Sequence, residues 1–96
     1  MAKTLSLPDA ARLFKMLGDE ARLCILLLLA GRGAMNVGEL CAAVGMRQAA
    51  LSHHLSHLLL HGLIACRRRG RYRYYAIAPG IVRELLRFVK PERRRL

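Results

Sequence analysis

One segment of the chain restricts the fold more than any other. From Leu23 to Ala30 eight consecutive residues are apolar, between Arg22 and Arg32. A helix that is apolar on nearly every side is stable only where other elements cover it all round. The run is also less than half of the roughly 20 residues that a transmembrane helix needs. We therefore predict that Glu20–Ala30 is the buried central helix of a small, mainly helical core.

The length of the chain predicts a single domain, residues 1–96. Ninety-six residues leave no room for a second domain, and no internal repeat or linker divides them. A chain of this size buries only about two-thirds of its unfolded surface, so a second copy would add stability. Cys24, Cys41 and Cys66 are odd in number and widely spaced, which favours reduced thiols over a disulfide framework. We expect a cytoplasmic protein that associates with a second copy of itself.

Helical periodicity continues on both sides of the central segment. Apolar residues recur at helical spacing from Pro8 to Leu17, and Gly18-Asp19 can end that helix and cap the next. Towards the other end, Pro79-Gly80 introduces a last helix, Ile81–Val89, with apolar residues on more than one face. We expect this last helix to dock on another surface, such as a second subunit.

Two helices joined by a glycine lie between these segments. Asn36 and Glu39 have the spacing of a capping box that begins the first, Val37–Val44, and Gly45 ends it. The second is predicted over Arg47–His61. Two helices joined by a Gly-containing turn of three or four residues are typical of a helix-turn-helix. The second helix carries Leu51, Leu55, Leu58 and Leu59 on one face and Arg47, Gln48, Ser52, His53 and Ser56 largely on another.

The periodicity changes after Gly62. Residues from Leu63 onward begin an extended segment, Arg69-Gly70-Arg71 suits a tight turn, and Tyr72–Ile77 is rich in residue types found in strands. Five of the seven residues from Arg67 to Arg73 are arginine. We predict a small β-hairpin with an arginine-rich tip.

The positive charge is concentrated on these last elements. Lys and Arg number 17 against six Asp and Glu, which gives a net charge of +11, and no acid lies between Leu40 and Arg83. Duplex DNA carries a phosphate charge about every 1.7 Å along its axis, and cations that neutralise it release counterions. The usual alternative is a solvated charged turn. The density of arginine, without lysine, favours phosphate or groove contact.

The polar face of the helix Arg47–His61 has residues that can read bases. Gln48, Ser52 and His53 are spaced i, i+4 and i+5, so they can share one face. Glutamine can form two hydrogen bonds to adenine, and serine or histidine can bind bases or phosphates. The alternative is an ordinary polar surface on a core helix, and the spacing alone leaves that open.

Several segments together resemble the ArsR/SmtB family of bacterial repressors. The resemblance rests on Gly18–Leu23, Glu39–Gly45, Gln48–Leu55, Leu58, Gly62–Ile64 and Arg69–Tyr75. It extends roughly from Asp9 to Val89. It implies a winged helix-turn-helix homodimer, joined through its first and last helices, that represses an operon by binding an imperfect palindrome in double-stranded DNA. It also implies that Gln48, Ser52 and His53 face the groove, that His54 and Leu55 support the helix, and that Arg69, Arg71 and Arg73 act from the wing.

Two positions depart from the family's pattern. Arg47 stands where the family commonly has a small capping residue, which weakens the helix cap but adds a cation near the DNA. Leu60 stands where a basic or polar residue is frequent, and it predicts an extra apolar contact. The complete predicted DNA-binding set is Arg47, Gln48, Ser52, His53, Ser56, Arg69, Arg71 and Arg73.

No metal site and no cofactor are predicted. The family's metalloid site has cysteines at the positions that Asn36 and Gly38 occupy in this chain. Only Cys41 remains nearby, and one thiol cannot form that site. The last helix lacks the Asp and His residues of the family's other common site. His53, His57 and His61 recur every four residues, but no Cys or carboxylate nearby completes a zinc set, so a surface or DNA-contacting role is favoured.

Cys66 raises a redox-sensing hypothesis. It precedes Arg67-Arg68-Arg69, and nearby positive charge favours the reactive thiolate form of a cysteine. The alternative, which we favour, is that Cys66 is a small apolar strand residue. Cys24 and Cys41 are expected to fill space in the core, where free cysteines are common.

The leading functional hypothesis is a sequence-specific DNA-binding repressor whose inducer the sequence does not identify. The alternative is an architectural nucleic-acid-binding protein without a ligand. An enzyme is disfavoured, since the chain lacks a recognisable nucleophile and base, a Gly-rich phosphate loop and a paired-carboxylate pocket. With 54% apolar residues the chain is no disordered basic tail. A membrane-surface partner is disfavoured because the arginines lie at a hairpin tip rather than along an amphipathic helix.

Overall fold

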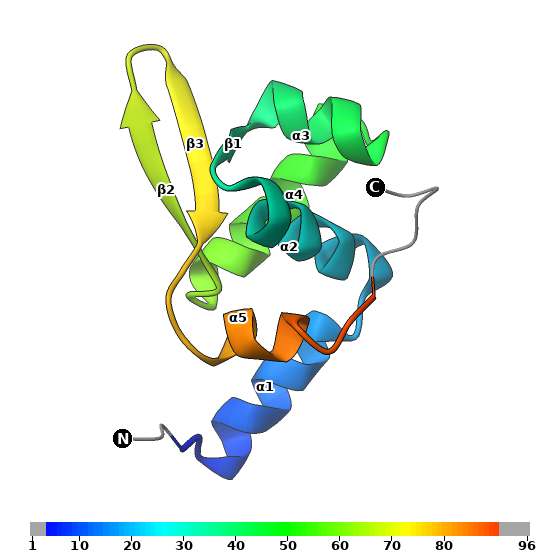
Figure 1. Cartoon of the computed structure of the whole chain (residues 1–96), viewed down its shortest axis with the longest axis vertical. Coiled ribbons are helices and arrows are strands. Elements are labelled where there is room, and N and C mark those ends of the chain that lie inside the picture. The colour runs from blue at the N-terminus through cyan, green and yellow to red at the C-terminus, as the bar shows by residue number, and fades with distance from the viewer. Residues whose placement is uncertain (1–3, 91–96) are drawn as a thin grey trace.

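Helix α2, Glu20–Arg32, lies at the centre of the fold, with the other elements arranged around it (Figure 1). The computed structural model describes residues 4–90. Within them, the prediction of a mainly helical fold with a hairpin wing is confirmed. The other elements are α1 Leu7–Leu17, β1 Met35–Asn36, α3 Val37–Val44, α4 Gln48–Leu60, β2 Ile64–Arg69, β3 Tyr72–Ile77 and α5 Ile81–Leu86.

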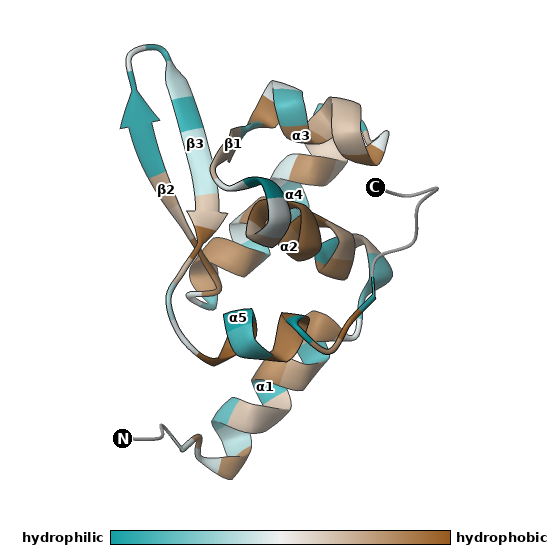
Figure 2. Cartoon of the chain, viewed as in Figure 1, coloured by the Kyte–Doolittle hydropathy of each residue, from teal (hydrophilic) through white to brown (hydrophobic). Residues whose placement is uncertain are grey.

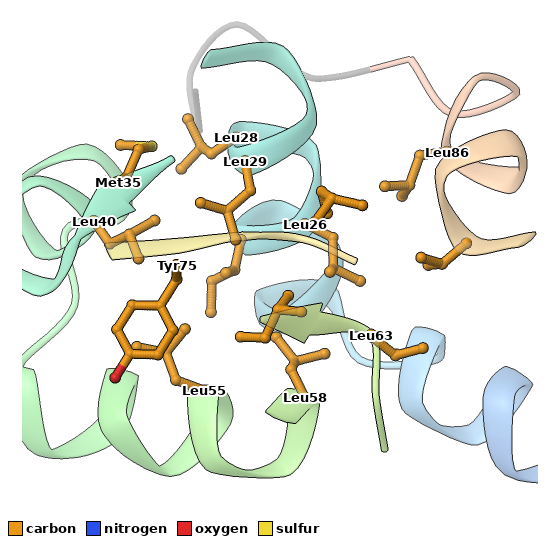
Figure 3. Packing of buried hydrophobic residues seen from close by; sticks show 14 of the residues in the cluster. Leu26, Leu28, Leu29, Met35, Leu40, Leu55, Leu58, Leu63, Tyr75 and Leu86 are labelled. Atoms are coloured by element: carbon orange, nitrogen blue, oxygen red, sulfur yellow. The ribbon is translucent and has the colours of Figure 1, made fainter. Parts of the chain in front are cut away.

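The burial predicted for the central helix is confirmed. Ile25, Leu26 and Leu29 of α2 have almost no exposed surface. Leucines from α3 and α4 pack into the same cluster, as Figure 3 shows. Fully burying a leucine contributes about 1.5–3 kcal/mol relative to leaving it exposed, so this cluster anchors α3 and α4. The largest fully buried side chains outside α2 are Leu40, Leu51, Leu55 and Leu58.

One arginine ties the end of α1 to the start of α2. The backbone N–H of Arg22 donates to the carboxylate of Asp19 at 3.0 Å, which confirms the predicted cap. The Nε of Arg22 donates at 2.8 Å to the carbonyl oxygen of Met16, in the last turn of α1. Both bonds satisfy backbone groups that helix ends leave unpaired. Arg22 therefore stabilises two helix ends at once.

The start of α3 combines the predicted capping box with a strand that the sequence did not reveal. The N–H of Glu39 donates to Oδ1 of Asn36, and the N–H of Asn36 donates to Oε1 of Glu39, both at 2.9 Å. Met35 and Asn36 also pair with Tyr75 and Tyr74, which gives an antiparallel sheet of order β1-β3-β2. Two residues are too few to show the alternation that marks a strand.

The last helix is shorter than predicted. Helix α5 ends at Leu86, whereas the apolar pattern predicts a helix to Val89. The backbone N–H groups of Arg87, Phe88 and Val89 donate to carbonyls three residues back, so the backbone there has tightened into 3₁₀ geometry. Helix α5 still packs against α2 and buries Val82 and Leu86.

Candidate nucleic-acid interface

Helices α3 and α4 form the predicted helix-turn-helix. Gly45 ends α3 with φ +68°, a left-handed conformation that favours glycine, and its N–H donates to the carbonyl oxygen of Cys41 at 2.9 Å. This cap reverses the chain within three residues, so α4 begins at Gln48. Leu40 of α3 and Leu51 of α4 are then buried in the common core.

Helix α4 has a core face and an outward face. Leu51, Leu55 and Leu58 are buried against the rest of the domain. The predicted base-reading side chains lie on the outward face. Two small residues on this face leave room for DNA to approach the helix closely. The exposed residues of this face are Gln48, Ala49, Ala50, Ser52, His53 and Ser56.

Two leucines of α4 lie differently from the prediction. The sequence pattern places Leu59 on the buried face, but its side chain is 36% exposed. The extra apolar contact predicted for Leu60 is wrong among the described residues, since Leu60 is 80% exposed. Successive helical residues are rotated by about 100°, so burial of Leu58 turns the next two side chains away from the core.

The first turn of α4 has no side-chain cap. Arg47 occupies the N-cap position with extended backbone, and its side chain makes no capping hydrogen bond. This agrees with the weakened cap expected at that position. Uncapped N–H groups and the positive end of the helix dipole attract phosphate, and the exposed Arg47 adds to this attraction.

Three histidines lie in α4, and a fourth, His61, is the residue that follows it. The rings of His53 and His57 meet edge to face with centroids 4.6 Å apart, and Nδ1 of His61 lies 2.9 Å from the carbonyl oxygen of His57. Burial, and then the neighbouring His53, lowers the pKa of His57. His54 turns inward, and its Nδ1 is buried without a hydrogen-bond partner in the part of the chain that the structure describes. His53 is therefore the member of the series that is most open to a ligand at the start of α4.

The hairpin of β2 and β3 projects away from the helices as a wing, with a hydrophilic distal half (Figures 1 and 2). Gly70 makes the tight turn with φ +62°. Paired residues of antiparallel strands point to the same side, and successive residues alternate. Arg68 is paired with Arg73, on the face that carries the buried Tyr75 nearer the base of the hairpin.

The other face of the wing has a different composition. Arg67 is paired with Tyr74, and Arg69 with Tyr72, so these four side chains share the face directed away from the core. We call this set the outer wing face. We call the opposite face, which carries Arg68, Arg73 and Tyr75, the inner face. The three predicted wing contacts are thus divided: Arg73 lies on the inner face, Arg69 on the outer wing face and Arg71 in the turn.

Arg68 is the candidate contact that the sequence reasoning missed. It is exposed and directly opposite Arg73. A signal was present, because counting outward from a two-residue turn at Gly70-Arg71 pairs 69 with 72 and 68 with 73. We define the duplex face as Arg68 and Arg73 together with the exposed outward residues of α4, namely Gln48, Ala49, Ala50, Ser52, His53 and Ser56.

The three cysteines are reduced thiols. Cys24 and Cys41 are half-buried and pack against the core, in line with the expectation for them. Cys66 lies in β2 as expected, but it is exposed rather than packed. Its cross-strand neighbour is Tyr75, whose pKa is raised by burial first and then by Cys66.

The structure does not support a metalloid site at the start of α3. Oδ1 of Asn36 accepts the capping hydrogen bond of Glu39, and Gly38 has no side chain to offer. Within residues 4–90, no group of three or more His, Cys, Asp or Glu side chains is arranged to hold a metal ion. None of the helices in the described ranges has the length and apolar character needed to cross a bilayer.

Comparison with known proteins identifies the family. Residues 19–65 match the family described as bacterial regulatory protein, arsR family. An uncharacterised HTH-type transcriptional regulator of Methanocaldococcus jannaschii is 38% identical over 80 residues, which cover 83% of this chain and 90% of that protein. The chain belongs to the ArsR family. The arsenical resistance operon repressor of Escherichia coli is 41% identical over 70 residues, 73% of this chain and 60% of that repressor.

Solved structures of other proteins share the fold. HlyU from Vibrio cholerae superposes with a TM-score of 0.79 at 31% identity, over 83% of this chain and 86% of that one. The homodimeric winged helix-turn-helix DNA-binding domain of Mb0332 from Mycobacterium bovis superposes with a TM-score of 0.77 at 36% identity. The match covers 91% of this chain and 84% of that one. This ArsR-family protein is therefore a winged helix-turn-helix transcriptional regulator, with α4 as its recognition helix and β2–β3 as its wing.

Proposed function

We propose that this ArsR-family regulator represses transcription by binding one operator sequence as a homodimer, with α4 in the major groove and the wing on the flanking backbone or minor groove. The observation that carries the proposal is the duplex face. Exposed polar side chains on α4 and the Arg68–Arg73 pair belong to one acid-free stretch of the chain, and the leucines on the opposite side of α4 fix the helix in the core. A recognition helix presents residues near its N-terminus to base edges.

Within this face the side chains divide by chemistry. Gln48 can bind adenine through two hydrogen bonds, and Ser52 and His53 can bind base edges or phosphates on the same side of the helix. Arg47 and Ser56 sit beside them as further DNA contacts. Arg68, Arg71 and Arg73 supply phosphate contacts from the wing, which position the protein but carry little sequence information. Arg69, which the sequence also predicts as a contact, lies on the outer wing face, on the side of the hairpin opposite to Arg68 and Arg73.

We further propose that two copies associate through the first and last helices, α1 and α5, together with residues 87–90 that follow α5. Leu7 and Phe14 of α1 are 83% and 62% exposed, and Phe88 beyond α5 is 88% exposed. Large exposed apolar side chains on the terminal elements of a small domain favour burial by a partner. The homodimeric state stated for the Mycobacterium bovis domain supports this arrangement.

The proposal includes the wider setting of the protein. Residues 1–96 act as one domain in the cytoplasm, without a cofactor, a membrane partner or an enzymatic activity. The two relatives described above are named as a transcriptional regulator and an operon repressor. The candidate site offers side chains that can bind DNA, but no nucleophile paired with a general base.

Selection of bound fragments from random duplex DNA tests the proposal. We expect one motif to be enriched and its complex to survive an excess of unrelated competitor DNA. Enrichment of no motif, with binding that depends only on salt, would favour an architectural protein instead.

A further inference from the structure

The outer wing face is left outside the proposed duplex interface. Arg67, Arg69, Tyr72 and Tyr74 point to the side of the sheet opposite to Arg68 and Arg73. Within residues 4–90 the side chains of these four residues make no hydrogen bond, ion pair or ring contact with other side chains, and Tyr72 is 53% exposed. Two guanidinium groups and two phenol rings are therefore free to meet a ligand.

A hollow of about 610 Å³ opens on this side of the sheet. Ala65 and Ala76 are directly paired, and because their side chains end at Cβ they leave a depression between taller neighbours. Arg67, Arg69 and Tyr74 line the hollow towards the wing tip. Ala34 and Pro79 line it near the base of the hairpin, so the hollow has an apolar floor and a cationic, aromatic wall.

This combination suits an unpaired nucleotide better than a duplex. Proteins bind single strands by stacking bases on aromatic side chains while cationic groups follow the backbone, and a β-sheet is a common platform for it. A duplex keeps its bases stacked on one another, so it has no free ring face to place in the hollow. It would meet Arg67 and Arg69 only through phosphates.

We propose that the outer wing face binds single-stranded nucleic acid, with one base in the hollow against Tyr74 and the adjoining phosphates at Arg67 and Arg69. This activity goes beyond the proposed operator binding and does not depend on it. The duplex face and the outer wing face would then serve two forms of nucleic acid from the two sides of one hairpin.

Two double variants separate the faces while changing the net charge equally. Arg67→Ala/Arg69→Ala removes two arginines from the outer wing face, and Arg68→Ala/Arg73→Ala removes two from the inner face. The affinity of each full-length variant is measured by fluorescence anisotropy with a labelled oligothymidylate and, separately, with a labelled duplex of mixed sequence. Circular dichroism melts check that each variant is folded.

The expected results are opposite for the two variants. Arg67→Ala/Arg69→Ala should weaken oligothymidylate binding about tenfold or more and duplex binding less than about threefold, whereas Arg68→Ala/Arg73→Ala should do the reverse. Tyr74→Ala should weaken oligothymidylate binding about tenfold, and Tyr74→Phe, which keeps the ring, should bind like the parent. Tyr72→Ala changes a more exposed side chain and should weaken oligothymidylate binding several-fold. It provides a second test if Tyr74→Ala fails to fold.

Equal losses of oligothymidylate affinity in both double variants would overturn the proposal, since they would show attraction by total charge alone. Unchanged oligothymidylate affinity in the folded tyrosine variants would overturn it as well. Neither result bears on operator recognition, because a failure of that function appears as duplex binding without sequence preference.

Discussion

Arg68 and Arg73 lie directly opposite each other across β2 and β3, on the same face of the wing. Like charges at directly paired positions destabilise a hairpin. Neither residue has an acidic neighbour on α4 or the hairpin, because those elements contain no Asp or Glu. We therefore expect the repulsion between these two side chains to lower the stability of the free protein, and a bound phosphate to relieve that repulsion.

Replacing one member of this pair should separate stability from binding. Arg73→Gln should raise the free energy of unfolding at low salt by roughly 0.2–1 kcal/mol, and the gain should vanish in high salt. It should also weaken binding to all duplexes and reduce the salt slope by about 1. Thermal melts and salt titrations measure both effects.

The matched control is Arg69→Gln, which removes the same charge opposite Tyr72 rather than opposite an arginine. It should not raise the melting temperature, and an equal rise there would contradict the pairing argument.

Gln48 is predicted to read a base. Gln48→Ala should relax the preference at one base pair by about 1–3 kcal/mol while leaving binding to unrelated DNA nearly unchanged. Affinities for the selected fragment and its single-base variants measure this. Ser56→Ala, on the next turns of the same exposed face, should change the preference at that base pair little. If Gln48→Ala weakened specific and non-specific binding alike, glutamine would be a positioning contact instead.

The cap of α2 should make the fold sensitive to acid. The backbone N–H of Arg22 foremost, and then the charge of Arg22, lowers the pKa of Asp19. Since the pKa in the folded state lies below the unfolded value of about 3.9, this stabilisation is present above that pH and is lost as the pH falls through the folded value.

Two substitutions at Asp19 resolve this contribution. Asp19→Ala should cost about 0.5–2 kcal/mol at neutral pH, because it removes the cap acceptor. Asp19→Asn keeps a hydrogen-bond acceptor but has no titrating group. It should therefore retain part of the stability, while the free energy of unfolding should fall less steeply as the pH is lowered. Urea unfolding between neutral pH and pH 3 measures both; an unaltered acid dependence in Asp19→Asn would show that other carboxyl groups account for it.

The exposed face of α1 should hold the dimer together. Phe14→Gln removes an apolar side chain that is 62% exposed in the single chain and should shift the protein towards monomer in sedimentation equilibrium. Leu60→Gln removes a comparably exposed leucine from α4, outside the proposed dimer surface, and should leave the oligomeric state unchanged. Dissociation by Leu60→Gln but not by Phe14→Gln would place the interface elsewhere.

Much of the fold could be predicted because local signals agreed with tertiary packing. The all-apolar run from Leu23, the capping box at Asn36 and Glu39 and the glycine at position 45 each specify one local structure, and all are present as predicted. The strand Met35–Asn36 could not be predicted, since it pairs with Tyr74 and Tyr75, which are far away in the sequence.

Side-chain placement in the wing and at helix ends needed the structure. Which face an arginine occupies depends on the pairing register, so a set chosen by proximity in sequence, such as Arg69 with Arg73, fell on both faces while Arg68 was overlooked. The apolar pattern also continues past Leu86, although the backbone there has left α-helical geometry.

Hydroxyl-radical footprinting of the selected fragment tests the central claim most directly. A dimer that places α4 of each copy in successive major grooves should protect two symmetric segments centred about 34 Å, or one helical turn, apart. Arg68→Ala/Arg73→Ala should weaken the flanking protection from the wings while the two centres stay in place. Uniform protection along the fragment, or a single segment without a symmetric partner, would contradict the account.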